Sequence, residues 1–209
     1  MRIIEPGFEI LDSIDGDAIL KKLELCARTC YKSEDQIRDG SAEKLIRYLI
    51  SSGHESVIEH QSVTVRIICD RGVSHEIVRH RLASYSQEST RYCNYGKTGE
   101  VTFIRPMFFQ YGSDLYCKWR EQMEHAEAAY LSMLRCGAKP QEARSVLPNS
   151  LKTEIVVTMN LREWRHFLKL RTAPNAHPQI RQIAIPLLKE FQRCIPVIFE
   201  DISSSGESV

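Results

Sequence analysis

The sequence from Lys152 to Arg171 reads KTEIVVTMNLREWRHFLKLR and contains two successive periodicities. Apolar residues occupy every second position from Ile155 to Met159, as on a strand with one buried face. Asn160 follows as a candidate helix N-cap, and Glu163 stands three residues later, at the acidic position of a capping box. The pattern predicts a strand that passes directly into a helix, and we expect the helix to reach Arg171.

The same order of strand and helix occurs earlier in the chain. Residues from Ser62 to Asp70 alternate at strand spacing, and the glycine at position 72 then interrupts the pattern. The residues from Val73 to Arg79 can form a short helix. Because helices and strands are mixed without a regular βαβ alternation, the sequence favours an α+β fold over a doubly wound sheet.

Three longer segments have the spacing of amphipathic helices. The clearest runs from Ser113 to Cys136 and carries an apolar stripe that begins at Leu115. A second is expected to begin at Ser41 as its N-cap, and a third to extend from Pro178 to about Phe199 with a kink at Pro186. We therefore predict a mainly antiparallel sheet packed by several amphipathic helices.

The length and composition of the chain suit one globular domain. It has 209 residues, of which 43% are hydrophobic and 26% charged. A chain of this size buries roughly 70% of its unfolded surface in a single core. We expect residues 1–202 to form one domain and residues 203–209 to be a disordered tail.

The near-zero net charge argues against partners that bind through a strong overall electrostatic field of the protein. The chain carries 28 basic and 27 acidic side chains, a formal net charge of +1, so we expect neither nucleic acid nor a membrane as a partner. No segment reads as a signal peptide or a membrane span. The seven cysteines are an odd number without a CxxC pair, which is typical of reduced thiols in the cytoplasm rather than of a disulfide scaffold or a structural zinc site.

The stretch from Arg79 to Tyr92, RHRLASYSQESTRY, has the composition of an anion-binding loop. Arginine presents a planar fork of donors that fits phosphate or carboxylate, and hydroxyl groups complete the coordination of the oxygens. By composition alone, a solvated basic loop is an equal alternative.

Arg79-His80-Arg81, followed after seven residues by Ser89, resembles the signature of the flavin-dependent thymidylate synthases. The sequence GHESVIEH from Gly53 to His60, Arg144, and the segment from Asn160 to Arg171 follow in that family's order. The resemblance implies methylation of dUMP to dTMP with methylenetetrahydrofolate as the one-carbon donor, FAD for hydride transfer and NADPH as the reductant. It also implies a homotetramer with active sites at its subunit interfaces.

The resemblance assigns roles to particular side chains. The FAD-binding positions are Ser56, Arg79, His80, Arg81, Gln87, Asn160, Arg162 and His166. The dUMP-binding positions are Glu76, Gln87, Ser89, Arg91, Arg144 and Arg171. Arg171 is also the expected catalytic residue, because its guanidinium would lie against the pyrimidine and stabilise negative charge when C5 becomes nucleophilic. Many members carry other residues at Glu76, Gln87 and His166, but these three side chains can also form hydrogen bonds.

Three other interpretations remain open. A zinc hydrolase could use the histidines and carboxylates His54, Glu55, Glu59, His60, His75 and His80, although the first four do not have HExxH spacing, and we expect no metal. The basic loop could belong to a nucleotide or nucleic-acid binder without catalysis. Ser89 could be a nucleophile, but no acid-oriented histidine can be inferred beside it, so a phosphate-binding hydroxyl is favoured.

Overall fold

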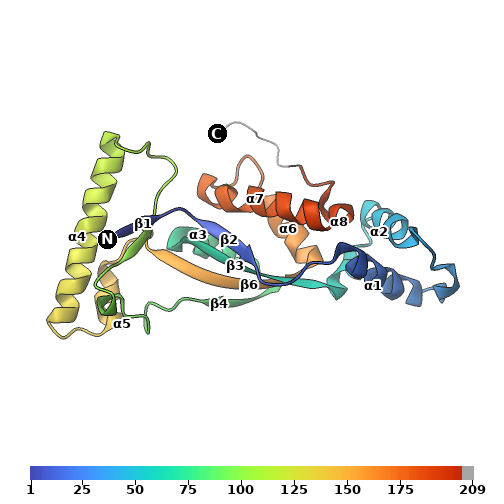
Figure 1. Cartoon of the computed structure of the whole chain (residues 1–209), viewed down its shortest axis with the longest axis horizontal. Helices are drawn as coiled ribbons and strands as arrows, with labels where there is room; N and C mark the ends of the chain where they lie inside the picture. The colour runs from blue at the N-terminus through green and yellow to red at the C-terminus, as the bar shows by residue number, and fades with distance from the viewer. Residues whose placement is uncertain (204–209) are drawn as a thin grey trace. The chain divides into compact units, whose positions relative to one another are not determined.

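The computed structural model of the chain describes residues 1–203 (Figure 1). The predicted tail therefore lies outside the described residues except for Ser203. The strands are β1 (Arg2–Ile4), β2 (Gly7–Ile10), β3 (Ser62–Asp70), β4 (Ala83–Gln87), β5 (Thr102–Ile104) and β6 (Lys152–Asn160). The α-helices are α1 (Gly16–Thr29), α2 (Ser41–Ser51), α3 (Arg71–Ile77), α4 (Asp114–Arg135), α5 (Pro140–Ala143), α6 (Leu161–Arg171), α7 (Pro178–Cys194) and α8 (Pro196–Phe199). Short 3-10 helices are η1 (Glu34–Gln36), η2 (Glu55–His60), η3 (Tyr95–Lys97) and η4 (Arg144–Val146).

The main sheet has the strand order β2-β3-β6-β4 and is antiparallel, which confirms the predicted α+β class. The backbone N–H of Leu161, just after β6, donates to the carbonyl of Gln61, just before β3, at 2.8 Å. At the opposite ends of these strands, the N–H of Arg71 donates to the carbonyl of Leu151 at 3.2 Å. The remaining strands, β1 and β5, form a separate parallel pair.

The chain folds into two compact units. Unit 1 comprises residues 1–7, 67–79 and 85–156, and unit 2 comprises residues 8–66, 80–84 and 157 onward. In unit 1, α4 packs against α5 and η4, and β1 pairs with β5 (Figure 1). The core of this unit is formed by the buried side chains of Val101, Phe103, Met123, Tyr130, Ala143 and Leu151.

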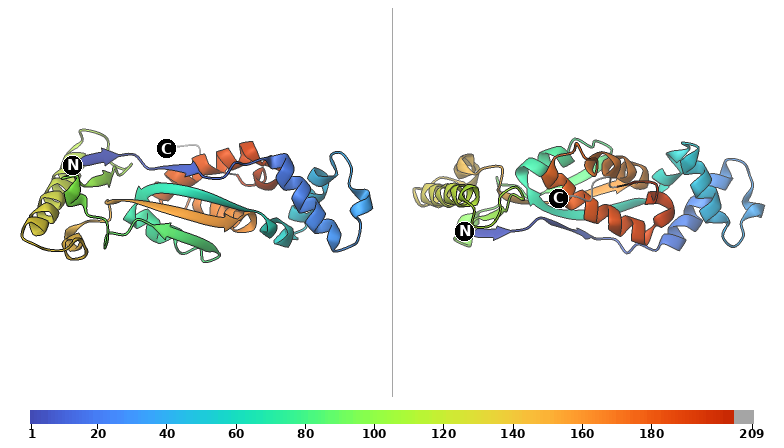
Figure 2. Two further views of the ribbon diagram at one scale, coloured as in Figure 1. Left: turned by 60° about the horizontal axis from the view of Figure 1, so that its bottom comes forward. Right: turned by 90° about the horizontal axis from the view of Figure 1, so that it is seen from above.

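Unit 2 is mainly helical. Helices α1 and α2 lie side by side, and α6 packs against η2, α7 and α8 (Figure 2). The indole of Trp164 meets the rings of Phe167 and Phe191 edge to face, and its Nε1 donates to the carbonyl of Val63 at 2.9 Å. Because Trp164 is fully buried and its N–H is satisfied, it fixes α6 on the core of unit 2.

Three details of the predicted helices are wrong. Ser41 is the first residue of α2 rather than its cap, because Gly40 takes the cap position in the left-handed region, at φ 72°. Leu115 is 65% exposed and does not belong to the buried stripe of α4. The last predicted helix is two helices separated at Ile195, because the residue before Pro196 is biased away from helical dihedrals. The preceding helix α7 continues through Pro186.

Candidate functional site

The junction of β6 and α6 organises the functional side chains of unit 2. Asn160 caps the helix, as predicted, since its Oδ1 accepts from the backbone N–H of Glu163 at 2.9 Å. The face of α6 that carries Trp164, Phe167 and Leu168 is buried. Helical spacing therefore places the residues Arg162, His166 and Lys169 on the exposed side.

A pocket of about 600 Å³ opens on that side. Its lining residues are Glu55, Glu59, Leu82, Asn160, Arg162, Glu163, Arg165, His166 and Lys169. Three of the predicted FAD-binding residues, Asn160, Arg162 and His166, are therefore brought together in one cavity. Its volume lies within the range of about 300–1,000 Å³ that is usual for ligand pockets.

The two arginines of the pocket are paired with two of its carboxylates. Arg162 Nη1 lies 2.5 Å from Glu59 Oε1, and Arg165 Nε lies 3.2 Å from Glu55 Oε1. Arg165 is almost fully buried, and its terminal nitrogens also reach the carboxylate of Asp201 at 2.6 and 2.7 Å. Arg165 therefore has a structural role, whereas Arg162, whose side chain is half exposed, can exchange its partner for a ligand.

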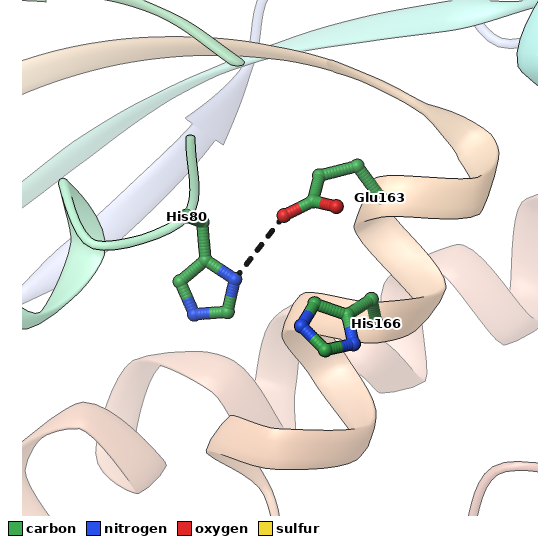
Figure 3. Close-up of side chains that lie close together, drawn as sticks. All are labelled: His80, Glu163 and His166. Carbon is green, nitrogen blue, oxygen red and sulfur yellow. Dashed lines mark hydrogen bonds and ion pairs between the residues drawn. The ribbon is translucent and has the colours of Figure 1, made fainter. Parts of the chain in front are cut away.

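His80 is held between a cation and an anion. Its Nδ1 lies 3.3 Å from Glu163 Oε1, and its Nε2 accepts from Arg171 Nε at 3.1 Å. Figure 3 shows the imidazole of His80 facing Glu163. The ring of His166 lies nearby, on α6, the helix that also carries Glu163. The ring of Phe167 meets the imidazole edge to face at 4.8 Å between centroids. The side chains of His80 and Glu163 are 3% and 8% exposed, so both are largely buried.

The hydrogen bonds assign the protonation state of His80. Arginine Nε only donates, so His80 Nε2 must present a lone pair, and the proton lies on Nδ1, where it is donated to Glu163. Burial, reinforced by the charges of Arg171 and His166, lowers the pKa of His80 to about 4, so the imidazole is neutral near pH 7. Burial also raises the pKa of the Glu163 carboxyl, and His166 partly opposes that shift.

A second group of predicted residues lies in unit 1. Gln87, at the end of β4, donates through Nε2 to Ser74 Oγ at 3.0 Å and to Thr153 Oγ1 at 3.2 Å. Because both acceptors come from the protein, the amide of Gln87 ties β4 to α3 and β6 within this unit. Any ligand contact of Gln87 must be made alongside these bonds.

The residues predicted to hold the dUMP phosphate meet around the turn after β4. Arg144 Nη1 donates to Thr90 Oγ1 at 3.2 Å, and Arg91 Nε donates to Gln141 Oε1 at 3.3 Å. The hydroxyl of Ser89 accepts from the backbone N–H of Arg91 at 3.3 Å. Ser89, Arg91 and Arg144 are therefore brought into one group, and both arginines are exposed.

The remaining predicted residues lie on η2, on α3 and in the segment that follows α3. Ser56 is exposed on η2, between the pocket residues Glu55 and Glu59. Arg81 is exposed beside Leu82, which also lines the pocket. In unit 1, Glu76 lies on α3 and the exposed Arg79 follows that helix. The geometry neither adds to nor removes from their expected roles.

Of the residues named for a zinc hydrolase, His80 alone belongs to a possible metal-binding group within residues 1–203. Glu55 and Glu59 pair with arginines rather than with histidines. Within residues 1–203, the group of three or more side chains that could hold a metal is His80, Glu163 and His166. A metal on Nδ1 of His80 would leave the proton on Nε2, where it would face the N–H of Arg171. The observed bond from Arg171 therefore disfavours that site.

A family model described as thymidylate synthase complementing protein matches residues 12–197. The chain belongs to this family. Two relatives named flavin-dependent thymidylate synthase come from Pyrococcus furiosus and Mycobacteroides abscessus. The first is 37% identical over 78% of this chain and 67% of its own length, and the second is 34% identical over 90% of this chain and 82% of its own length.

A solved structure of the same fold is a UMP/dUMP methylase, PolB from Streptomyces cacaoi, bound with 5-Br dUMP. It is 26% identical, with a TM-score of 0.79 and 96% coverage of both chains. The similarity to known proteins therefore includes the backbone fold as well as the sequence. Within the described part of the chain, no helix has the length and apolar character needed to cross a membrane.

Several residues of the site were not singled out by sequence reasoning. Glu163 was expected to complete a capping box, but its carboxylate turns to His80 instead. Lys169 and Leu82 also line the pocket, and Phe167 contacts His80. The helical spacing of Asn160, Glu163 and His166 could have placed Glu163 near the flavin residues, but its partner is 83 positions away in the sequence.

Proposed function

We propose that the chain methylates dUMP to dTMP with FAD as its cofactor, methylenetetrahydrofolate as one-carbon donor and NADPH as reductant. The observation that carries the proposal is the pocket at the β6–α6 junction. In a chain that belongs to the flavin-dependent thymidylate synthases, it gathers Asn160, Arg162 and His166 in one cavity. The proposal extends to a homotetramer in the cytoplasm whose active sites combine residues of more than one subunit.

The donors of the pocket suit a flavin dinucleotide. Arg162 and Lys169 are about half exposed and can meet phosphate oxygens, while the amide of Asn160 offers both donors and an acceptor. The ring of His166 and the exposed side chain of Leu82 provide flat and apolar surface for a planar ring system. Ser56, Arg79, Arg81 and Gln87 complete the proposed set. Bound FAD would supply hydride chemistry that the amino-acid side chains lack.

The protein's own contribution is to bind and polarise dUMP. Arg91, Arg144 and the hydroxyl of Ser89 are proposed to hold the phosphate, with Glu76 and Gln87 as further contacts. Arg171 is proposed to meet the oxygen and nitrogen edge of the pyrimidine. Its fixed positive charge would stabilise the negative charge that develops as C5 becomes nucleophilic, so no cysteine nucleophile is required.

An anaerobic absorbance titration tests the proposal directly. Purified protein should show a flavin spectrum, either as isolated or after addition of FAD, and NADPH should bleach it. Addition of dUMP and methylenetetrahydrofolate should then yield dTMP, which chromatography can quantify. Protein that binds no flavin under any of these conditions would refute the proposal.

The pyrimidine nucleotide should be varied in the same assay. The solved structure of similar fold is described as a UMP/dUMP methylase, so UMP is the specific competitor to test. We expect dUMP to be the preferred substrate. A higher kcat/KM with UMP would retain the reaction class and change the substrate.

A further inference from the structure

Glu163 lies at the end of a directed chain of hydrogen bonds. Arg171 donates to His80 at 3.1 Å, and His80 shares its other ring nitrogen with Glu163 at 3.3 Å. Every donor in this chain points toward the carboxylate. The inner part of the chain is largely buried, since neither His80 nor Glu163 is more than 8% exposed and the ring of Phe167 meets the imidazole edge to face.

We propose that Glu163 is a positioning residue for Arg171 and acts through the tautomer of His80. As the acceptor for Nδ1–H, the carboxylate holds the proton on that nitrogen and leaves the Nε2 lone pair facing Arg171. The imidazole then fixes the direction of Nε–H and, since a guanidinium is planar, the orientation of the whole group. This inference rests on the proposed function only in that Arg171 is taken to meet the pyrimidine.

The alternative tautomer shows why the carboxylate matters. With the proton on Nε2, the imidazole would present an N–H to the Nε–H of Arg171, and two donors would face each other. Arg171 would then have to turn away. Because the imidazole is 3% exposed, its ring nitrogens depend mainly on protein partners, and the acceptor at position 163 favours one of the two states.

Glu163→Leu and Glu163→Gln separate positioning from simple packing. Leucine fills similar space without an acceptor, whereas glutamine keeps an oxygen that can accept from His80 Nδ1–H. We expect Glu163→Leu to lower kcat for dTMP formation about ten- to hundredfold and Glu163→Gln to restore it to within about threefold of wild type. Because Glu163 also lines the proposed flavin pocket, kcat is expressed per bound flavin, measured from the absorbance of each purified variant. Glu43→Leu, which also removes a first-turn carboxylate from a helix of unit 2, should have no effect.

A double-mutant cycle with Arg171→Lys makes the coupling measurable. If Glu163 acts through the arginine, Glu163→Leu should cost little further activity once the guanidinium is gone. A structural role for Glu163 predicts instead that the two losses multiply. Multiplying losses, or equal activity of the leucine and glutamine variants, would overturn the proposal.

Nitrogen NMR of the flavin-free protein provides a readout that does not need activity. His80 should be neutral at pH 7 with its proton on Nδ1, and Glu163→Leu should shift the proton toward Nε2. Wild-type His80 with its proton on Nε2 would disprove the inference even if no variant folds. If the wild type forms no dTMP, the proposed function fails, and the tautomer and its response to Glu163→Leu still decide the role of Glu163.

Discussion

The two groups of predicted site residues are held by the fold in different ways. In unit 2, His80 and Glu163 are buried, and a chain of hydrogen bonds joins them to the partly buried Arg171. In unit 1, Arg91 and Arg144 are exposed, and the guanidinium of each donates a hydrogen bond to a neutral side chain. The first arrangement fixes the geometry of a charge, whereas the second presents several charges to one anion. Substitutions in unit 2 should therefore impair chemistry, and those in unit 1 should impair affinity.

Arg171→Lys should have the largest effect. It keeps the positive charge but removes the planar fork and the Nε donor to His80. We expect a loss of about 2.7–4 kcal/mol of transition-state stabilisation, or about a hundred- to thousandfold in the rate of dTMP formation. NADPH oxidation and flavin content should persist. Near wild-type turnover at saturating dUMP would remove Arg171 from the catalytic residues.

Acid should weaken the fold through His80. Its pKa falls from 6.5 to about 4 on folding, so its contribution to stability is present above pH 6.5 and is lost as the pH falls through about 4. Lowering the pH from about 7.5 to about 4.5 should therefore reduce the contribution of His80 to the free energy of unfolding by about 2–3 kcal/mol. The raised pKa of Glu163 acts in the opposite direction.

Urea unfolding of wild type and His80→Gln at both pH values isolates the contribution of the histidine. The acid-induced loss of unfolding free energy should be smaller in the variant. Equal losses in the two proteins would show that His80 is not buried in its neutral form.

Ser89→Ala should have a smaller effect, and it should weaken the affinity for dUMP rather than slow the chemistry. A phosphate-binding hydroxyl contributes about 0.5–1.5 kcal/mol, so KM for dUMP should rise at most about tenfold while kcat is kept. Steady-state kinetics at saturating dUMP measures this. Loss of kcat with unchanged affinity would instead identify Ser89 as a nucleophile and would contradict the contrast between the two units.

The smallest expected difference is between the urea midpoints at which the two units unfold, because we expect the two midpoints to coincide. Trp119 reports on unit 1 and Trp164 on unit 2, so Trp164→Phe and Trp119→Phe each leave a fluorescent probe in one unit. If residues 1–202 form one cooperative domain, as we propose, the probe in each variant should follow the same urea transition as circular dichroism of that variant. A transition seen by only one of the two methods would show that the units unfold separately.

The sequence predicts local structure here more reliably than long-range pairing. The alternation before Asn160 and the cap itself are local signals, and the β6–α6 junction was predicted correctly from them. The end of α7 was missed although Pro196 signals it, because the apolar stripe continues into α8. The bond between Glu163 and His80 could not be predicted, because it depends on tertiary packing between residues 83 positions apart.

Helix α6 also fixes how the chain can vary in length. Trp164 and Phe167 of this helix are buried in the core, and Arg162 and His166 line the pocket. Each residue advances by about 100° around the helix axis, and this advance places the two pairs on different faces. One inserted residue would rotate everything after it and turn pocket side chains into the core. Insertions and deletions should therefore be excluded between Asn160 and Arg171 and accumulate in turns such as residues 105–113, where no such alignment is needed.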